Sequence, residues 1–336
     1  MAYSNVGTPV FYIDNYLYHK TIGTTLTEGI PADVYNMKPQ ITTTIDADFN
    51  IQLPVSPINY NLYGNMKYYI AFLNHDIGTS SGWANISTII TDENDVQITS
   101  DIDVIRGGWN GYSFINGSTI LAIDTAHDTS FYKLNNSGAF NLGAVSTGIQ
   151  YTMPHSPDLK LNMEIEFDGV DTITTSGGGS ISNINYTGNP LWINGDNKTN
   201  PFDTYGNTLD VTTSGARRNG RKFWSLKFSY LSDVDLFASN PRGSGSTNGG
   251  YTEDVSQYES SDIHSSGGEL EYDMETDDSF VAQVWNKVGM GISFIFQPDS
   301  NHRDDFYICK FDQDSLRVTQ EASKAYSISL KIVEVW

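Results

Sequence analysis

The stretch KFWSLKFSYL, residues 222–231, decides the fold class because apolar and polar side chains alternate along it. Successive side chains of a β-strand point to opposite faces, so a period of two indicates a strand with one buried and one solvated face. Serine and lysine side chains occupy one face of this strand. The other face carries four large side chains: Trp224, Leu226, Phe228 and Tyr230.

Two further segments repeat this alternation and predict two more half-buried strands. The first is LKLNMEIEF, residues 159–167, which ends at a turn signal, Asp168-Gly169. The second is YSISLKI, residues 326–332. The side chains expected to point inward are Leu159, Leu161, Met163, Ile165 and Phe167 in the first segment, and Tyr326, Ile328, Leu330 and Ile332 in the second.

A third pattern predicts an antiparallel pair of strands. The segment FIFQPD begins with three apolar residues, 294–296, and the strand should stop at Pro298 because proline cannot donate to a ladder. The polar stretch SNHRDD, residues 300–305, then predicts a turn, and FYICKFD, residues 306–312, should return as the partner strand. We expect both strands to share a sheet with residues 326–332.

The chain ends on the apolar sequence VEVW, residues 333–336, where most chains end in polar residues. This ending indicates a terminus that is docked, either in a sheet of its own chain or on a partner. An apolar strand at a sheet edge needs cover, so pairing between subunits is one way to satisfy it. In either case Trp336 should be anchored.

Turn-forming residues separate these segments, and helical spacing is scarce. Clusters of Gly, Asn, Asp and Pro stand between the strand patterns. The best helix candidate is DSFVAQVWNKV, in which Phe280, Val284 and Val288 fall on one side. The sequence therefore predicts an all-β fold of β-sandwich or jelly-roll domains with one short helix. A Gly/Ser-rich and then acidic stretch, residues 232–279, predicts a long loop.

The length of 336 residues exceeds what one hydrophobic core usually serves, so we expect more than one domain. Residues 1–35 form a leading strand and arm in this interpretation. Residues 36–148 are a coherent run of strands. A second unit, residues 149–336, contains the long loop as an excursion.

Charge and cysteine content narrow the classes of partner. Forty acidic residues against 19 basic ones give a net charge of −21, which would repel a nucleic acid backbone. No apolar run approaches the roughly 18 residues of a membrane span, and no export signal is recognisable at the N-terminus. We expect synthesis in the cytosol, no nucleic acid binding and no membrane insertion.

Cys309 is the only cysteine and is interpreted as a core residue, because it has no partner for a disulfide.

Motifs for catalysis and for cofactors are missing from the sequence. The six histidines lack H-x-x-x-H spacing, and neither a nucleophile elbow nor a phosphate-binding loop occurs. We predict no catalytic residue, no cofactor and no metal site. DADFN, residues 46–50, has the spacing of a calcium loop, but Ile51 and Pro57 stand where that loop needs Gly and Glu. DENDVQ, residues 92–97, suits a hairpin turn or a bound cation. The many acidic residues leave a paired-carboxylate hydrolase open.

Three aromatic residues are candidates for contact with a glycan or a partner. Trp83, Trp109 and Tyr112 lie in the Gly-flanked stretches SSGWAN and GGWNGYSF, and an aromatic ring held on a turn can stack on a sugar. Packing in a core or interface is the alternative. The glycine-rich stretch SGGGS, residues 176–180, has the composition of a phosphate-binding loop, but no helix pattern follows it, so we predict a turn or bulge.

Several long segments occur in an order that resembles tailed-bacteriophage virion proteins of the tail tip, such as distal tail and minor tail proteins. The resemblance covers nearly the whole chain, and none of its motifs is catalytic. The segments are GTPVFYIDNYLYHKTIG, YYIAFLNHDIGTSSG, the run from IQYTMPHSPDL to SISNINY, GRKFWSLKFSYLSDVDLF, GISFIFQPDSNHRDDFYICKFDQDS and YSISLKIVEVW.

The resemblance implies a fold for each half of the chain. IAFLNHDIG is similar to a strand and turn of galactose-binding-like jelly-roll modules, in which the residues matching Asn74 and His75 are mainly structural. Residues 36–148 would then form such a module, with no sugar site carried over. Residues 149–336 would form a distal-tail-like β-sandwich that assembles as a ring, commonly a hexamer. Here the module precedes the ring unit, whereas many distal tail proteins carry extra modules within or after it.

The implied function is that of a structural, non-enzymatic component of the virion, assembled in the host cytoplasm. Its homo-oligomeric ring would join the tail tube to hub proteins or fibres. Strand edges and aromatic side chains would close the ring. The residues expected to have structural or assembly roles are Trp224, Phe228, Phe294, Phe296, Ile328, Leu330 and Trp336.

Two alternatives from other functional classes stay open. The first is a host-glycan-binding adhesin, in which the jelly-roll-like unit presents Trp83, Trp109 and Tyr112 to a host surface glycan. The second is a polysaccharide-degrading tail enzyme that uses a pair of carboxylates.

Overall fold

The structure is a computed structural model of the 336-residue chain. The structure describes most of the second half of the chain and the strands of the first half. The described residues are 6–14, 32–39, 42–45, 49–52, 66–75, 90–91, 102–106, 117–123, 131–134, 140–159, 161–166, 170–184, 221–237, 242–243, 270–271, 279–301 and 306–335.

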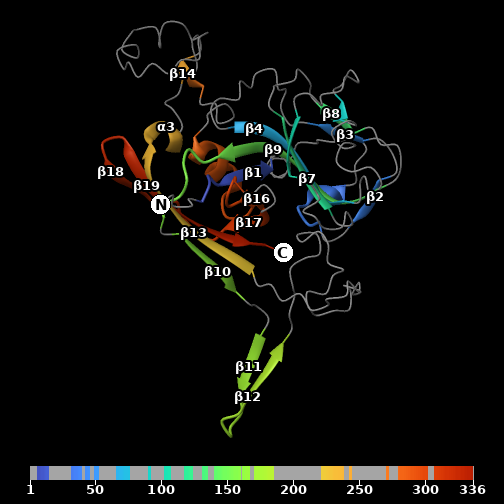
Figure 1. The fold of residues 1–336 in the computed structure, drawn as a ribbon, viewed down its shortest axis with the longest axis vertical. Helices are drawn as coiled ribbons and strands as arrows, with labels where there is room; N and C mark the ends of the chain where they lie inside the picture. The colour runs from blue at the N-terminus through green and yellow to red at the C-terminus, as the bar shows by residue number, and fades with distance from the viewer. Residues whose placement is uncertain are drawn as a thin grey trace.

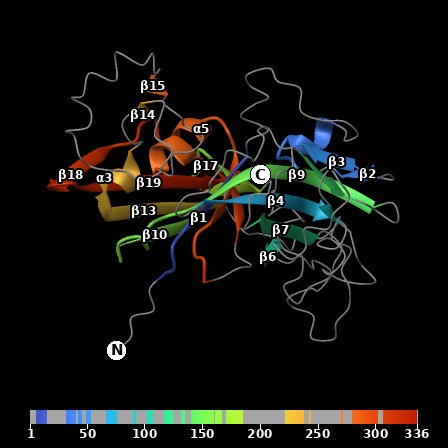
Figure 2. The same ribbon diagram turned by 90° about the horizontal axis from the view of Figure 1, so that it is seen from above.

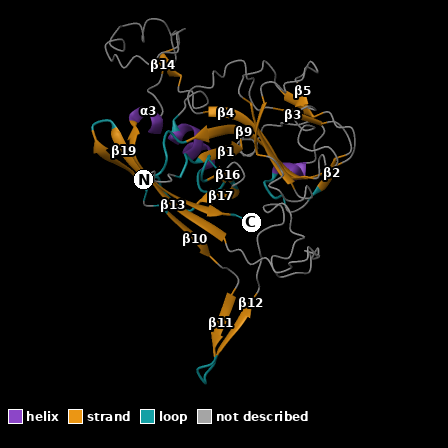
Figure 3. Ribbon diagram, in the orientation of Figure 1, coloured by secondary structure: helices purple, strands orange, loops and turns teal. Residues whose placement is uncertain are grey.

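Strands dominate these residues, and the prediction of an all-β protein is confirmed (Figure 3). Twelve strands form one antiparallel sheet. Along the sheet the order is β10 (Asn162–Glu166), β13 (Arg221–Ser232), β19 (Ala325–Glu334), β17 (Tyr307–Phe311), β16 (Phe294–Gln297), β1 (Val10–Asp14), β9 (Phe140–Thr152), β4 (Met66–His75), β7 (Gly117–Ile123) and β6 (Ile102–Arg106). In addition, β18 (Val318–Ala322) pairs with β19, and β2 (Thr43–Ile45) pairs with β9.

Smaller sheets and short helices complete the described fold. The small sheets are β11 (Val170–Thr174) with β12 (Ser180–Ile184), β14 (Arg242–Gly243) with β15 (Leu270–Glu271), and β3 (Phe49–Gln52) with β8 (Phe131–Leu134) and β5 (Ile90–Thr91). The helical segments are η1 (Ala32–Tyr35), α3 (Asp233–Leu236), the π-helical η5 (Val281–Trp285) and α5 (Asn286–Val288).

The predicted short helix is confirmed. Residues 280–288 are helical, and Phe280, Val284 and Val288 are all buried. The side chain of Phe280 packs edge-on against Phe11 of the central strand β1, with ring centroids 5.8 Å apart. The helix therefore covers one face of the sheet at its middle. The predicted long loop, residues 232–279, lies mostly outside the described residues.

The strand pairings predicted for the C-terminal region are also confirmed. β16 pairs with β17, with Phe294 opposite Cys309, and β17 pairs in turn with β19. On its other side β19 pairs with β13, so that Leu226 lies opposite Leu330. The terminal strand is thus an interior strand of its own sheet. Both edges of β19 are paired within its own chain along most of its length, because β18 also pairs with it; Trp336 lies outside the described residues.

One residue of the segment 222–231, Tyr230, was wrongly predicted to point inward. The register between β13 and β19 shifts between Phe228 and Leu231, which marks a bulge. Tyr230 has a positive φ of 64° and is 78% exposed, while Leu231 is buried in its place. The extra residue of the bulge reverses the alternation, and the strand pattern alone gave no sign of it.

The large sheet runs through both expected units of the chain (Figure 2). The expected boundary between residues 148 and 149 falls inside β9. The leading strand β1 pairs with β16 on one side and with β9 on the other, so that residues 10–14 connect the two halves of the sheet. Whether the halves fold as separate domains stays a prediction.

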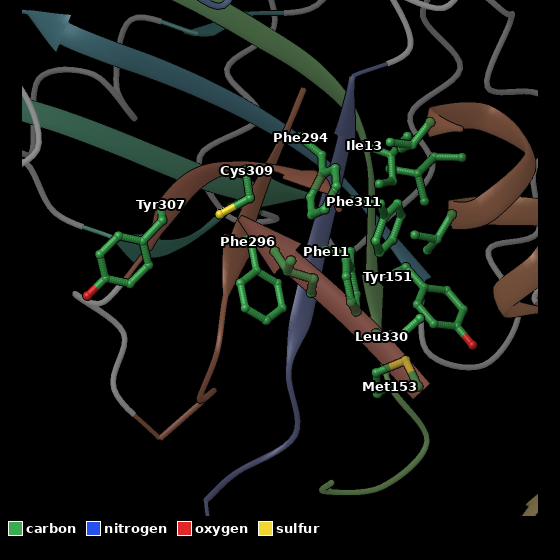
Figure 4. Close-up of a cluster of buried hydrophobic side chains, with 14 of the residues drawn as sticks. Phe11, Ile13, Tyr151, Met153, Phe294, Phe296, Tyr307, Cys309, Phe311 and Leu330 are labelled. Carbon is green, nitrogen blue, oxygen red and sulfur yellow. The ribbon is translucent and has the colours of Figure 1, made fainter. Parts of the chain in front are cut away.

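A cluster of aromatic side chains forms the centre of the core, beside β1 (Figure 4). Phe11 lies 5.2 Å from Phe296 and 5.7 Å from Phe294, measured between ring centroids. Full burial of one such side chain stabilises the fold by about 1.5–3 kcal/mol. Cys309 is buried in the same cluster, as predicted for a core cysteine.

Candidate assembly surface

Strand β10 is the last described strand at one end of the large sheet. It pairs with β13 through five residues, from Asn162 opposite Ser225 to Glu166 opposite Arg221. No described strand pairs with its other edge. Such an edge presents backbone N–H and C=O groups to any chain that can approach it as an additional strand.

The apolar side chains of β10 continue the inner face of the sheet beyond the covered core. Met163 lies opposite Trp224, and residues directly opposite in a sheet point to the same face. Trp224 is buried, yet Met163 is 53% exposed and Ile165 is 49% exposed. Leu159, just before the strand, is 76% exposed. We call Leu159, Met163 and Ile165 the β10 strip.

This finding corrects the prediction that residues 159–167 form a half-buried strand. The strand and its alternation are present, but all five residues of β10 are exposed, and Phe167 lies outside the described residues. Only Leu161 packs partly against the core. The physical reason is that the elements covering the sheet end at β13, so the apolar face of β10 has nothing over it among the described residues.

The segment that leads into β10 is tied firmly to β13. The backbone N–H of Asp158 donates to the carbonyl of Lys227 at 2.7 Å. The Ser229 hydroxyl donates to a carboxylate oxygen of Asp158 at 2.6 Å. These hydrogen bonds hold the backbone just before the β10 strip against β13, although the side chains of the strip are not part of the core.

The hairpin of β11 and β12 projects away from the large sheet (Figure 1). Its turn is the stretch SGGGS, which was predicted to form a turn or bulge, and that prediction is confirmed. Thr175 N–H donates to the carbonyl of Gly179 at 2.8 Å, and Gly178 N–H donates to the carbonyl of Thr175 at 2.9 Å. Gly178 has a φ of 79°, a conformation that favours glycine.

The two faces of this hairpin differ in character. Ile173 and Ile181 are directly opposite each other and are 65% and 61% exposed. On the other face the Thr172 and Ser182 hydroxyls are 3.3 Å apart and share a hydrogen bond. An isolated two-stranded hairpin is marginally stable in water, so an apolar pair at its centre favours a partner.

Six of the seven residues predicted for structural or assembly roles lie in the core of a single copy, and Trp336 lies outside the described residues. The ring centroids of Trp224 and Phe296 are 5.5 Å apart, and those of Phe294 and Phe296 are 6.5 Å apart. Buried in this way, they have little surface left for a neighbour. The six are Trp224, Phe228, Phe294, Phe296, Ile328 and Leu330.

The three candidate glycan contacts, Trp83, Trp109 and Tyr112, lie outside the described residues, as do the acidic turns at residues 46–48 and 92–97. The structure places Asn74 and His75 in the interior of the sheet. The side-chain N–H of Asn74 donates to the carbonyl of Pro39 at 2.6 Å. Nε2 of His75 lies 2.7 Å from Oγ1 of Thr119. Both have structural contacts, in keeping with the role that the resemblance implies.

Two charged side chains, Glu334 and Lys222, lie near Cys309. The backbone N–H of Lys222 donates to the Glu334 carboxylate at 3.1 Å, and the Lys222 ammonium lies 4.1 Å from the ring centroid of Tyr307, to whose hydroxyl it donates. Burial raises the pKa of the Cys309 thiol well above its ordinary value, the charge of Glu334 raises it further, and Lys222 opposes the shift. The thiol therefore stays protonated at neutral pH and is unsuited to nucleophilic chemistry.

Among the described residues no group of three or more His, Cys, Asp or Glu side chains is arranged to hold a metal ion. No helix in the same part of the chain has the length and apolar character of a membrane span. No family model, curated protein or solved structure matches the chain.

The sequence indicated the strand β10 but not its role at the surface. The residues predicted for assembly did not include the exposed apolar residues of this surface. These are Met163 and Ile165 on β10, and Ile173 and Ile181 on the hairpin. One signal was present in the sequence: the alternate positions Glu164 and Glu166 mark a solvated edge.

Proposed function

We propose that this chain is a structural virion component of a tailed phage, which forms a homo-oligomeric ring at the tail tip or baseplate and joins the tail tube to hub or adhesion proteins. The observation that carries this proposal is the β10 strip beside a strand edge with which no described strand pairs. An exposed apolar strand at a sheet edge is a site for pairing with another chain.

The proposal includes a finer description of the fold. Residues 149–336 form a distal-tail-like β-sandwich, and residues 36–148 form a galactose-binding-like jelly-roll module. The buried alternation of β13 and β19 supports the first assignment, and the continuous buried strand from Tyr69 to Leu73 supports the second. The resemblance of the long sequence segments supplies the order of the two units.

Ring formation follows from the kind of contact that this surface favours. A contact between two different patches on identical subunits is head-to-tail, and such contacts close into rings when the rotation between subunits allows it. With a net charge of −21, copies of the chain repel one another at long range, so apolar contact is needed to hold them together. The same acidity suits a ring through which DNA passes without adhering.

Electron microscopy tests the proposal at two levels. Images of the purified full-length chain should show closed rings, and antibody labelling of the intact particle should place the chain at the tail tip or baseplate in ring-like copy number. The variant Ile165→Asp is the matched control, because it alters the β10 strip and leaves the core unchanged. A protein that stays as single copies and is absent from the tail would overturn the proposal.

A further inference from the structure

Each copy of the chain has two exposed apolar surfaces among its described residues. The first is the edge of β10 that no strand of the described part of the chain pairs with, and the β10 strip beside it. The second is the projecting hairpin with the exposed pair Ile173 and Ile181. Resting on the function proposed above, we infer that the β11–β12 hairpin of one copy adds to this edge of β10 in the next copy.

The lengths of the two surfaces match. The pairing of β10 with β13 covers five residues, and so does the pairing of β11 with β12. A hairpin strand added to β10 therefore extends the large sheet by the full length of that edge. Backbone hydrogen bonds supply affinity in this mode of recognition, and alternate side chains supply specificity.

The apolar side chains match as well. Met163 and Ile165 occupy alternate positions of β10 and point to one face of the sheet. Ile173 and Ile181 share one face of the hairpin. When a hairpin strand lies along β10, cross-strand neighbours on the same face are close enough to remove water from one another.

Charge repulsion favours the hairpin, rather than a second β10 strand, as the segment that pairs with the edge of β10. Antiparallel pairing of β10 with itself about its centre places Glu164 directly opposite Glu164, and like charges in that position are destabilising. The hairpin, residues 170–184, contains a single charged residue, Asp171. It is a stretch of an otherwise acidic chain that can approach the two glutamates of β10 with little repulsion.

Cysteine cross-linking tests this contact, since the only native cysteine is buried. Met163→Cys is made in one copy of the full chain and Ile181→Cys in another, and the two are co-expressed with different tags and treated with a short bismaleimide. We expect cross-linked dimers that carry both tags. Each variant expressed alone, and the unaltered chain, should give none. Thr172→Cys in place of Ile181→Cys tests the orientation and should lose most of the product, because it lies on the opposite face.

Other outcomes overturn the inference in distinguishable ways. Cross-linking of Met163→Cys alone indicates that β10 pairs with β10, and cross-linking of Ile181→Cys alone indicates contact between hairpins. Rings that form without any cross-link in the mixture overturn the hairpin contact and leave the proposed function standing. Single copies throughout, shown by light scattering of the same samples, overturn both. Thermal unfolding of each variant checks that it is folded.

Discussion

The centre of the large sheet and its β10 edge carry the same kinds of side chain in opposite surroundings. At the centre, Phe11 and Phe294 are fully buried and pack on each other, and Phe11 also packs against Phe280 of the helix. At the edge, Met163 and Ile165 belong to the same face of the sheet but are about half exposed. The difference lies in what covers the strand. Alternation thus predicts a strand with an apolar face, but it does not predict that the same copy of the chain covers that face.

The largest effect is expected at the centre. Phe11→Ala should lower the free energy of unfolding by about 3–5 kcal/mol, because it leaves a cavity among packed rings. Denaturant unfolding measures it. Ile165→Ala, measured on single copies, is the matched control and should change stability by less than about 0.5 kcal/mol. Equal losses for the two variants would break the distinction between centre and edge.

Removal of the terminal strand end should have the next largest effect. Deletion of residues 333–336 removes Val333 opposite Phe223 and Glu334 opposite Cys309, and leaves the partly buried N–H of Lys222 without this carboxylate. We expect a loss of about 3 kcal/mol or a failure to fold, since each lost buried hydrogen bond costs about 1 kcal/mol or more. Ser329→Ala, on the exposed face of the same strand, is the control. A truncated chain with normal stability would show that this terminus is dispensable.

The edge should respond in assembly rather than in folding. Ile165→Asp should weaken self-association by about 2 kcal/mol, or roughly thirtyfold, because it places a charge in an apolar contact. Sedimentation equilibrium measures the association constant. Met290→Asp alters an exposed apolar side chain outside the β10 strip and should leave association unchanged. If both variants associate as the unaltered chain does, the β10 strip is not the contact.

A smaller effect is expected from the buried thiol at alkaline pH. Burial raises the pKa of Cys309 in the folded chain, so the folded state holds this proton more tightly than the unfolded state does. Its contribution is complete below the usual thiol pKa of about 8.5 and falls as pH rises above it, by at most about 1.4 kcal/mol per pH unit. Unfolding measured from neutral to alkaline pH should show this decline. Cys309→Ala should lack that part of the slope, and an identical slope would contradict the assignment.

The smallest effect is expected at the β13 bulge. Tyr230→Gly should change the free energy of unfolding by less than about 0.5 kcal/mol, because relief of the positive φ offsets the greater freedom of glycine in the unfolded chain. Tyr230→Val should cost about 1 kcal/mol, since a branched side chain is strained in that conformation. Thermal unfolding of the pair compares them. A valine variant as stable as the glycine variant would mean that position 230 carries no strain.

The sequence predicted the strands of the C-terminal region because their signals are local. The pair β16 and β17, the inward face of β19 and the helix around Phe280 all follow from periodicity and from Pro298. The bulge at Tyr230 was missed because an inserted residue depends on the pairing partner rather than on the strand itself. The arrangement of twelve strands in one sheet depends on contacts far apart in the chain, such as β1 with β16, which no local pattern contains.

The candidate site was predicted less well for the same reason. The residues chosen for assembly were the most apolar ones, such as Phe228 and Phe294, and a folded copy buries such residues first. The exposed residues Met163 and Ile165 lie in an equally regular alternation, residues 159–167, which predicted that they point into a core. Their exposure depends on where the covering elements end.

Ring assembly is tested most simply by the native mass of the purified, unaltered chain in solution, measured by light scattering over a range of concentrations. A closed ring should give a mass that is one fixed multiple of 37.2 kDa. A mass that stays at that of one copy at every concentration would contradict ring assembly.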